Sequence, residues 1–150
     1  MSVNGTGPTG RPMTDPKYFT LDQANRTLPL VSRIVRDIIN EYAEWKDHVR
    51  QYEMLVGAAA EESADQIALR NRVEDLAARI NGYIQELAAI GCLFKGFEEG
   101  LVDFLGRRED RDVFWCWKFG EPRIQHWHEV DAGFAGRQPL VSSSGQTNTS

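Results

Sequence analysis

The sequence contains few cysteines: Cys92 and Cys116 are the two among its 150 residues. A disulfide scaffold needs several cysteine pairs, so this composition does not indicate a small secreted protein. The sequence also has no secretory signal and no apolar run near the ~18 residues of a membrane-spanning helix. We therefore expect a cytoplasmic protein with reduced thiols and no membrane partner. A single Cys92–Cys116 disulfide is the alternative.

Positive charge is also scarce, because 17 basic residues face 22 acidic ones and the net charge is -5. Proteins that bind the phosphate backbone of nucleic acids need an excess of positive charge. We therefore expect no nucleic-acid partner.

The chain has the length of one domain. Residues 1–17 and 141–150 are rich in small and polar residues, which predicts disordered tails. Residues 18–140 should form a single domain, with a helical hairpin over 18–91 and a β-meander with a wrapping segment over 92–140.

Two helical patterns dominate the first half of this domain. From Val31 to Val56 and from Leu69 to Ile90, apolar residues recur at alternating steps of four and three, the heptad spacing of packed helices. Gly57 and a short segment after it interrupt the pattern, so the two helices should lie antiparallel.

The first helix has two possible starts. Thr20 and Gln23 form a capping-box pattern that predicts a helical turn from Leu21. Pro29 lacks an N–H group, and its ring clashes with the preceding turn inside a helix. We therefore expect a second start, with Thr27 as N-cap and Pro29 in the first turn.

The apolar stripe of the hairpin is wider than a two-helix seam needs, so part of it would face water in an isolated hairpin. The C-terminal segment or a second copy of the chain must cover it, and two hairpins can pack as a four-helix bundle. The residues that we assign to a homodimer contact are Ile34, Ile38, Ile39, Tyr42, Trp45, Leu76, Ile80 and Ile84.

After Gly91 the pattern becomes extended, and it predicts three or four antiparallel strands. The run Val113–Phe119 is apolar on both faces, which indicates a central strand covered on both sides. The hairpin should cover one face, and either Phe134–Leu140 or a partner chain the other. The fold class is therefore α+β, a long coiled-coil-like antiparallel two-helix hairpin packed against a small β-meander. The predicted strands are Cys92–Phe94, Leu101–Leu105, Val113–Phe119 and Ile124–Val130, and the turns are Gly96–Gly100, Gly106–Asp112 and Gly120–Pro122.

The pair His126 and His128 is the first candidate site. Residues two apart on a strand point to the same face, so both imidazoles could bind one divalent transition metal such as zinc. Two ligands do not complete such a site. The others would have to come from Cys116, Asp103, Glu98 or Glu99. The alternative is that both histidines are half-buried and hydrogen-bonded, or stacked on tryptophans.

The strand register decides whether Cys116 joins these histidines. In one register Cys116 lies opposite His126 and shares its face. In the register shifted by one residue, Trp117 faces His126 and Cys116 points to the other side. The turn residues Gly120–Pro122 do not decide between the two.

A thiol mechanism is a second possibility, with Cys116 as nucleophile, His128 as base and Asp103 orienting the imidazole. A cysteine between two tryptophans in a central strand should be buried, however. Burial in apolar surroundings raises the pKa of a thiol and makes it unreactive.

Arg137 lies in a glycine-containing segment, Asp131–Gln138, that lacks the strand–loop–helix context of a phosphate-binding loop. We expect Arg137 to pair with Asp131 or Glu129. The functional alternative is that Arg137 clamps an anion such as phosphate or a carboxylate.

Four groups of residues resemble an uncharacterised bacterial family, domain of unknown function 2203. They are Tyr18–Asn25 with Leu28–Val31, Gly100–Phe104, Cys116–Lys118 with Gly120–Pro122, and Trp127–His128 with Gly133–Leu140. The family has no established activity. The resemblance implies that Asp103, Cys116, Trp117, Glu121, His128 and Arg137 match motif positions of the family and that His126 does not.

These features favour a non-enzymatic intracellular binding or assembly module that self-associates through its hairpin. The alternative is a metal-binding or thiol-dependent enzyme with its site on the C-terminal sheet.

Overall fold

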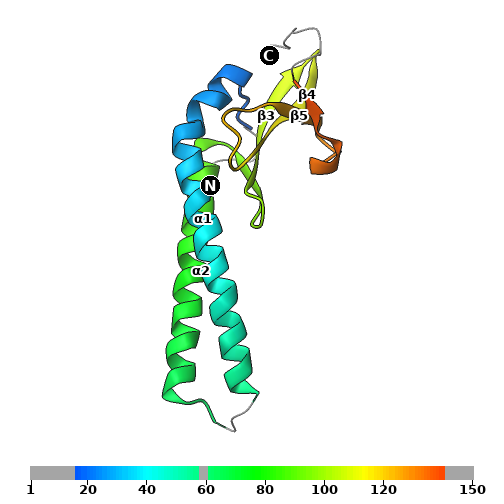
Figure 1. Ribbon diagram of the computed structural model, residues 1–150. Helices are drawn as coiled ribbons and strands as arrows, with labels where there is room; N and C mark the ends of the chain where they lie inside the picture. The colour runs from blue at the N-terminus through cyan, green and yellow to red at the C-terminus, as the bar shows by residue number, and fades with distance from the viewer. Residues whose placement is uncertain (1–15, 58–60, 141–150) are drawn as a thin grey trace, which may run out of the picture.

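The computed structural model describes residues 16–57 and 61–140. Two helices are followed by a five-stranded antiparallel sheet, which confirms the α+β prediction (Figure 1). The expected disordered tails lie outside these residues, except for Pro16 and Lys17. Among the described helices, none is both long and apolar enough to cross a membrane.

The hairpin consists of α1 (Leu21–Val56) and α2 (Ala64–Ile90), which pack side by side (Figure 1). The capping box predicted at the start of α1 is present. The Gln23 N–H donates to Thr20 Oγ1 at 3.0 Å, and the Thr20 N–H donates to Gln23 Oε1 at 2.9 Å. Gly91 follows α2 with a φ of 114°, the left-handed conformation that commonly ends a helix.

The predicted break at Pro29 is wrong, because α1 runs through it. Thr27 is not an N-cap, and its hydroxyl instead donates to the Ala24 carbonyl at 2.7 Å. A proline inside a helix costs about 3 kcal/mol. Leu28 and Val31 on either side are buried in the core, and each buried side chain of this size contributes about 1.5–3 kcal/mol. Packing therefore outweighs the proline. Figure 1 shows the first turns of α1, in blue, bent away from the axis of the rest.

The sheet is a meander in the order β2-β3-β4-β5-β6, and β4 is its central strand as predicted. The sheet has five strands instead of the three or four predicted, because a short last strand brings the chain after the 3-10 helix η2 back alongside β5. The elements are β2 (Leu93–Gly96), β3 (Leu101–Arg108), β4 (Arg111–Lys118), β5 (His126–Glu129), η2 (Phe134–Gly136) and β6 (Gln138–Pro139).

The turn between β3 and β4 is shorter than predicted. Arg108 pairs with Arg111, so the loop expected over Gly106–Asp112 is wrong and two residues connect the strands. Those residues, Glu109 and Asp110, have φ values of 52° and 66°. Two-residue turns with positive φ usually carry Asn-Gly or Asp-Gly, so Glu-Asp gives no recognisable turn signal.

One face of the sheet packs on the helices and forms the core. Phe104, Trp115 and Trp117 lie in the same buried cluster as Val31 and Val35 of α1. The Trp115 indole N–H donates to the Phe19 carbonyl at 2.8 Å, so its polar group is satisfied within the core.

The residues predicted to form a homodimer are largely covered within one chain. Ile34, Ile38, Leu76 and Ile80 are buried, and Ile39, Tyr42, Trp45 and Ile84 are half-buried. The sheet and the partner helix of the same chain thus provide much of the cover that we assigned to a second copy. The homodimer stays a prediction.

A methyl group at Gly106 should destabilise the fold. A Cβ there would lie 2.1 Å from Trp115 Nε1 and 2.9 Å from the Phe19 carbonyl oxygen. We expect Gly106→Ala to lower the free energy of unfolding by about 1–3 kcal/mol, the usual cost of overpacking, in urea denaturation. The control is Gly82→Ala in α2, where a Cβ meets nothing within 4 Å and should stabilise by up to about 1 kcal/mol. Equal stability of the two variants would contradict the packing described here.

Candidate functional site

The strand register places a group of polar side chains on the sheet face that points away from the helices. Asp103 of β3 pairs with Cys116 of β4, and Cys116 pairs with His126 of β5. The register that puts Cys116 opposite His126 is therefore the observed one, and the shifted register is wrong. Because side chains alternate along a strand, Trp115 and Trp117 face the helices while Cys116 faces the other way.

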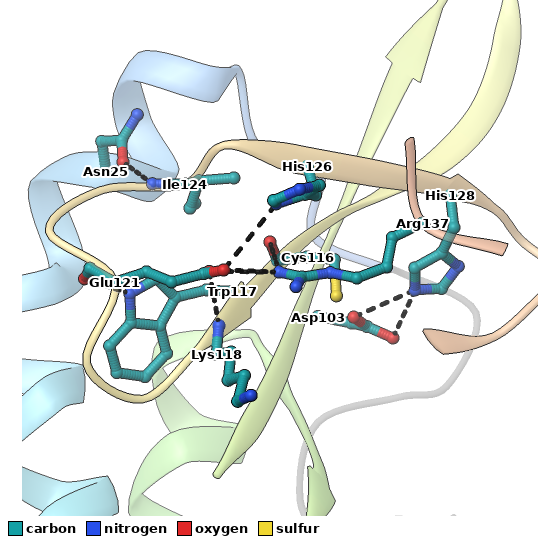
Figure 2. Close-up of polar contacts among 10 residues, drawn as sticks. All are labelled: Asn25, Asp103, Cys116, Trp117, Lys118, Glu121, Ile124, His126, His128 and Arg137. Carbon is teal, nitrogen blue, oxygen red and sulfur yellow. Dashed lines mark hydrogen bonds and ion pairs between the residues drawn. The ribbon is translucent and has the colours of Figure 1, made fainter. Parts of the chain in front are cut away.

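His128 and Asp103 form a buried polar pair on this face. His128 Nε2 lies 3.1 Å and 3.2 Å from the two carboxylate oxygens of Asp103, and both residues are less than 5% exposed (Figure 2). His128 Nδ1 lies 2.8 Å from the Glu129 carbonyl oxygen. A carbonyl oxygen only accepts, so Nδ1 carries a proton and Nε2 is the atom turned toward Asp103. Asp103 thus contacts His128, but both ring nitrogens are engaged, one by Glu129 and one by Asp103, and the predicted thiol mechanism stays a prediction.

Cys116 lies next to this pair. Figure 2 shows its sulfur between Asp103 and Arg137. One ligand atom from each of Asp103, Cys116 and His128 lies within 4.8 Å of the other two, and all three residues are buried. We call this group the Asp–Cys–His cluster.

The thiol of Cys116 is not in the state that a nucleophile needs. Burial raises its pKa to about 12, and the negative charge of Asp103 acts in the same direction. The thiol is therefore protonated at neutral pH, as we expected for a cysteine in a central strand. Cys92 is also a free, buried thiol, so the alternative Cys92–Cys116 disulfide is absent. Burial raises the pKa of Cys92 to about 12 as well.

A cavity of about 240 Å³ opens beside the cluster. Its remaining walls are mostly apolar, and Phe134 comes from the segment that folds back over the sheet after β5. That segment therefore lies over this face, as predicted for Phe134–Leu140. Beyond the cluster, the cavity is lined by Lys95, Leu101, Phe114, Val130, Gly133 and Phe134.

His126 lies outside the cluster, although it shares the face of Cys116. Its Nδ1 is 3.7 Å from a Glu121 carboxylate oxygen and makes no hydrogen bond with the described residues. Partial burial lowers its pKa, and the nearby charge of Arg137 adds to that effect. The structure thus separates the two histidines that the sequence suggested as joint metal ligands. Glu98 is also elsewhere, because it pairs with Lys46 at 2.8 Å.

Arg137 pairs with a carboxylate that we did not predict from the residues. Its Nη2 donates to both oxygens of Glu121 at 3.0 Å and 3.1 Å and approaches the Cys116 carbonyl oxygen at 3.4 Å (Figure 2). The expected partner Glu129 instead pairs with Arg111 at 3.0 Å. An anion site at Arg137 stays a prediction, and it would have to compete with the carboxylate of Glu121.

Glu121 is fixed by the turn between β4 and β5. Its side chain accepts from the Lys118 N–H at 2.9 Å, and its carbonyl accepts from the Trp117 indole N–H at 2.9 Å. These two contacts hold the carboxylate in front of Arg137. The signal available in the sequence was the turn Gly120–Pro122 together with the family resemblance, which marks Glu121 and Arg137 as motif positions.

The loop before β5 is also tied to the helices. The Ile124 N–H donates to Asn25 Oδ1 of α1 at 2.7 Å (Figure 2). This contact holds the start of β5, the strand that carries His128, against α1. The same helix packs on the sheet face opposite the Asp–Cys–His cluster.

Chemically, the cluster offers a carboxylate oxygen, a sulfur and an imidazole nitrogen at a cavity wall. These are the ligand types that zinc takes in proteins. Three such ligands with an accessible side are typical of catalytic zinc sites, whereas structural sites usually have four protein ligands.

Comparison with known proteins supports the family resemblance. The profile of one family, described as an uncharacterised conserved protein, matches residues 17–140. Neither the curated proteins nor the solved structures contain a significant match to the chain. Because the profile covers most of the chain, the protein belongs to the family called domain of unknown function 2203.

Proposed function

We propose that the Asp–Cys–His cluster binds a divalent transition metal such as zinc and that the protein is a metal-dependent enzyme. The observation that carries this proposal is the convergence of three buried ligand atoms within 4.8 Å at the wall of a cavity. This function corresponds to the alternative considered from the sequence, with three of its candidate ligands, Asp103, Cys116 and His128, and without His126.

The orientation of His128 supports the proposal. Histidines that ligate metals almost always donate their other ring N–H to a carbonyl or carboxylate, which fixes the tautomer. His128 Nδ1 makes such a contact with the Glu129 carbonyl oxygen at 2.8 Å. The opposite ring nitrogen, Nε2, is then directed into the cluster.

The charges of the cluster also suit a divalent cation. A thiolate and a carboxylate together carry two negative charges, which a divalent cation neutralises. Buried charges are costly unless they are paired or coordinate a metal. The thiol proton of Cys116 would be released on binding, because a metal deprotonates a coordinating thiol despite its raised pKa.

The cavity leaves room for a water molecule or a substrate at the metal. Within the described residues, no fourth His, Cys, Asp or Glu completes the cluster. Zinc-bound water has a pKa of about 7, far below that of bulk water. Hydrolysis is therefore the reaction class that this arrangement favours, in a cytoplasmic compartment that keeps the thiol ligand reduced.

A second candidate function rests on the far end of the hairpin. In Figure 1 the lower half of α1 and α2 extends beyond the sheet. This end exposes Met54, Leu55, Val56 and Ile67, and Met54 is 71% exposed. Exposed apolar clusters commonly mark contact surfaces. Self-association through the hairpin, our leading expectation from the sequence, therefore remains a proposal, with the contact moved toward its tip.

Metal binding can be tested on untagged full-length protein by elemental analysis and zinc titration. We expect about one zinc per chain, and a lower melting temperature when a chelator is added, because metal binding stabilises the folded state. Cys116→Ala and His128→Gln should each weaken zinc binding by at least the ~10–100-fold that changes beside a metal site cause.

The matched controls for this experiment are Cys92→Ala, which removes the other buried thiol, and His48→Gln, which removes a histidine of α1. Both should bind zinc like the unaltered protein. The proposal is wrong if the unaltered protein takes up no zinc, or if Cys116→Ala and Cys92→Ala bind it equally.

Self-association can be tested by size-exclusion chromatography with light scattering. We expect a dimer at micromolar concentration, and we expect the double variant Met54→Glu/Val56→Glu to be monomeric because it places charge on the apolar tip. The control is Ala78→Glu, which adds charge to an exposed position of α2. A monomeric unaltered protein would remove this second function without affecting the metal centre.

A further inference from the structure

The cavity beside the cluster has walls of two kinds. Lys95 of β2 lines one part, and Val130 and Phe134 from the segment after β5 line another. Phe114 of β4, between these strands, adds a second aromatic ring. The strand order β2-β3-β4-β5 therefore places the lysine and the Val130–Phe134 wall at opposite ends of the cavity, with the cluster residues on the strands between.

Lys95 is the only lysine or arginine in the cavity lining, and it makes no ion pair within the part of the chain that the structure describes. Neighbouring cations are engaged elsewhere. Lys46 pairs with Glu98 at 2.8 Å, Arg111 pairs with Glu129 at 3.0 Å, and Arg137 pairs with Glu121 at 3.0 Å. The ammonium group of Lys95 is thus available to a ligand.

The charge of the cavity follows from these groups. With a divalent metal bound, the cluster is neutral, because the charges of Asp103 and of the Cys116 thiolate balance the cation. The positive charge of Lys95 then gives the cavity lining a net charge of +1. A site with such a charge favours a monoanion over a neutral or cationic molecule.

The apolar walls indicate the rest of the ligand. Val130 is 49% exposed and Phe134 is 38% exposed, so both have apolar surface that a ligand can cover. Covering such surface contributes about 25 cal/mol per Å². The cavity volume of about 240 Å³ is below the ~300–1,000 Å³ of sites for drug-sized molecules, so the ligand must be small.

We propose that the cavity binds a small monocarboxylate with an apolar or aromatic body, whose carboxylate pairs with Lys95 and whose body packs against Phe114 and Phe134. This inference rests on the proposed metal centre, because the charge of the cavity includes the metal. Small monocarboxylates of this kind are then the substrate class of that centre. The bond that reacts would lie between the two ends of the ligand, beside the cluster.

The test uses zinc-loaded, full-length protein and two probes of similar shape, phenylacetate and the uncharged phenylacetamide. Binding is measured by isothermal titration calorimetry, and the zinc content of each sample by elemental analysis. We expect phenylacetate to bind about five-fold more tightly than phenylacetamide, the upper range for one exposed ion pair. Lys95→Gln should remove this difference, and Lys46→Gln should keep it.

A second variant tests the apolar wall. Phe134→Ala should weaken both probes to a similar extent, because it removes the surface that their rings share.

The outcomes separate the two proposals. If zinc binds but the unaltered protein does not prefer phenylacetate, the substrate class is wrong and the metal centre stands. If Lys95→Gln keeps the preference, the pairing of the carboxylate with Lys95 is wrong, and the proposal fails as stated. A carboxylate that binds the metal instead of Lys95 would give the second of these results. If no zinc binds, the metal centre is wrong, and this inference fails with it.

Discussion

The alternation of side chains along β4 is the constraint on which the rest of the structure depends. Trp115 and Trp117 must face the helices, because the core consists of these rings and the apolar face of α1. Cys116 must then face the other way. A shift of one residue would bury polar groups against the helices and expose the tryptophans, so the register is strongly specified. The register brings Cys116 beside Asp103 and leaves His128 in reach of both.

This constraint links the two halves of the molecule. The hairpin supplies the apolar surface against which the tryptophans pack. In the loop before β5, the Ile124 N–H donates a hydrogen bond to Asn25 Oδ1 of α1 at 2.7 Å. On the opposite face, the Arg137–Glu121 pair holds the returning C-terminal segment near the cavity, with the guanidinium 4.9 Å from the centre of the Phe134 ring. The helices thus act as a platform, and the Asp–Cys–His cluster lies on the face of the sheet that points away from them.

Much of the fold could be predicted from local patterns. The heptad spacing, the capping box at Thr20 and the two-faced apolar run of β4 each depend on neighbouring residues, and each prediction is confirmed. Two of the errors have a different origin. Proline normally interrupts a helix, but core packing around Pro29 outweighs that cost and α1 continues through it. The turn at Glu109 and Asp110 has positive φ values without the Asn or Gly residues that usually indicate them. Neither effect is visible in a short stretch of sequence.

The candidate site was only partly predictable. Cys116, His128 and Asp103 could be named from residue type, but their convergence depends on a register that the turn residues leave open. His126 was paired with His128 because both share a strand face, and the structure instead places it beside Glu121. Glu121 itself gave no signal from its chemistry. Its role follows from contacts with Lys118 and Trp117 that form only after the strands have paired.

In the proposed metal centre, one thiolate, one imidazole and one carboxylate hold a metal at the face of this sheet. X-ray absorption at the zinc edge of zinc-loaded protein tests it most directly, because it reports the elements bound to the metal. We predict one sulfur at about 2.3 Å, with nitrogen and oxygen ligands at about 2.0–2.2 Å. A zinc shell without sulfur would contradict the account.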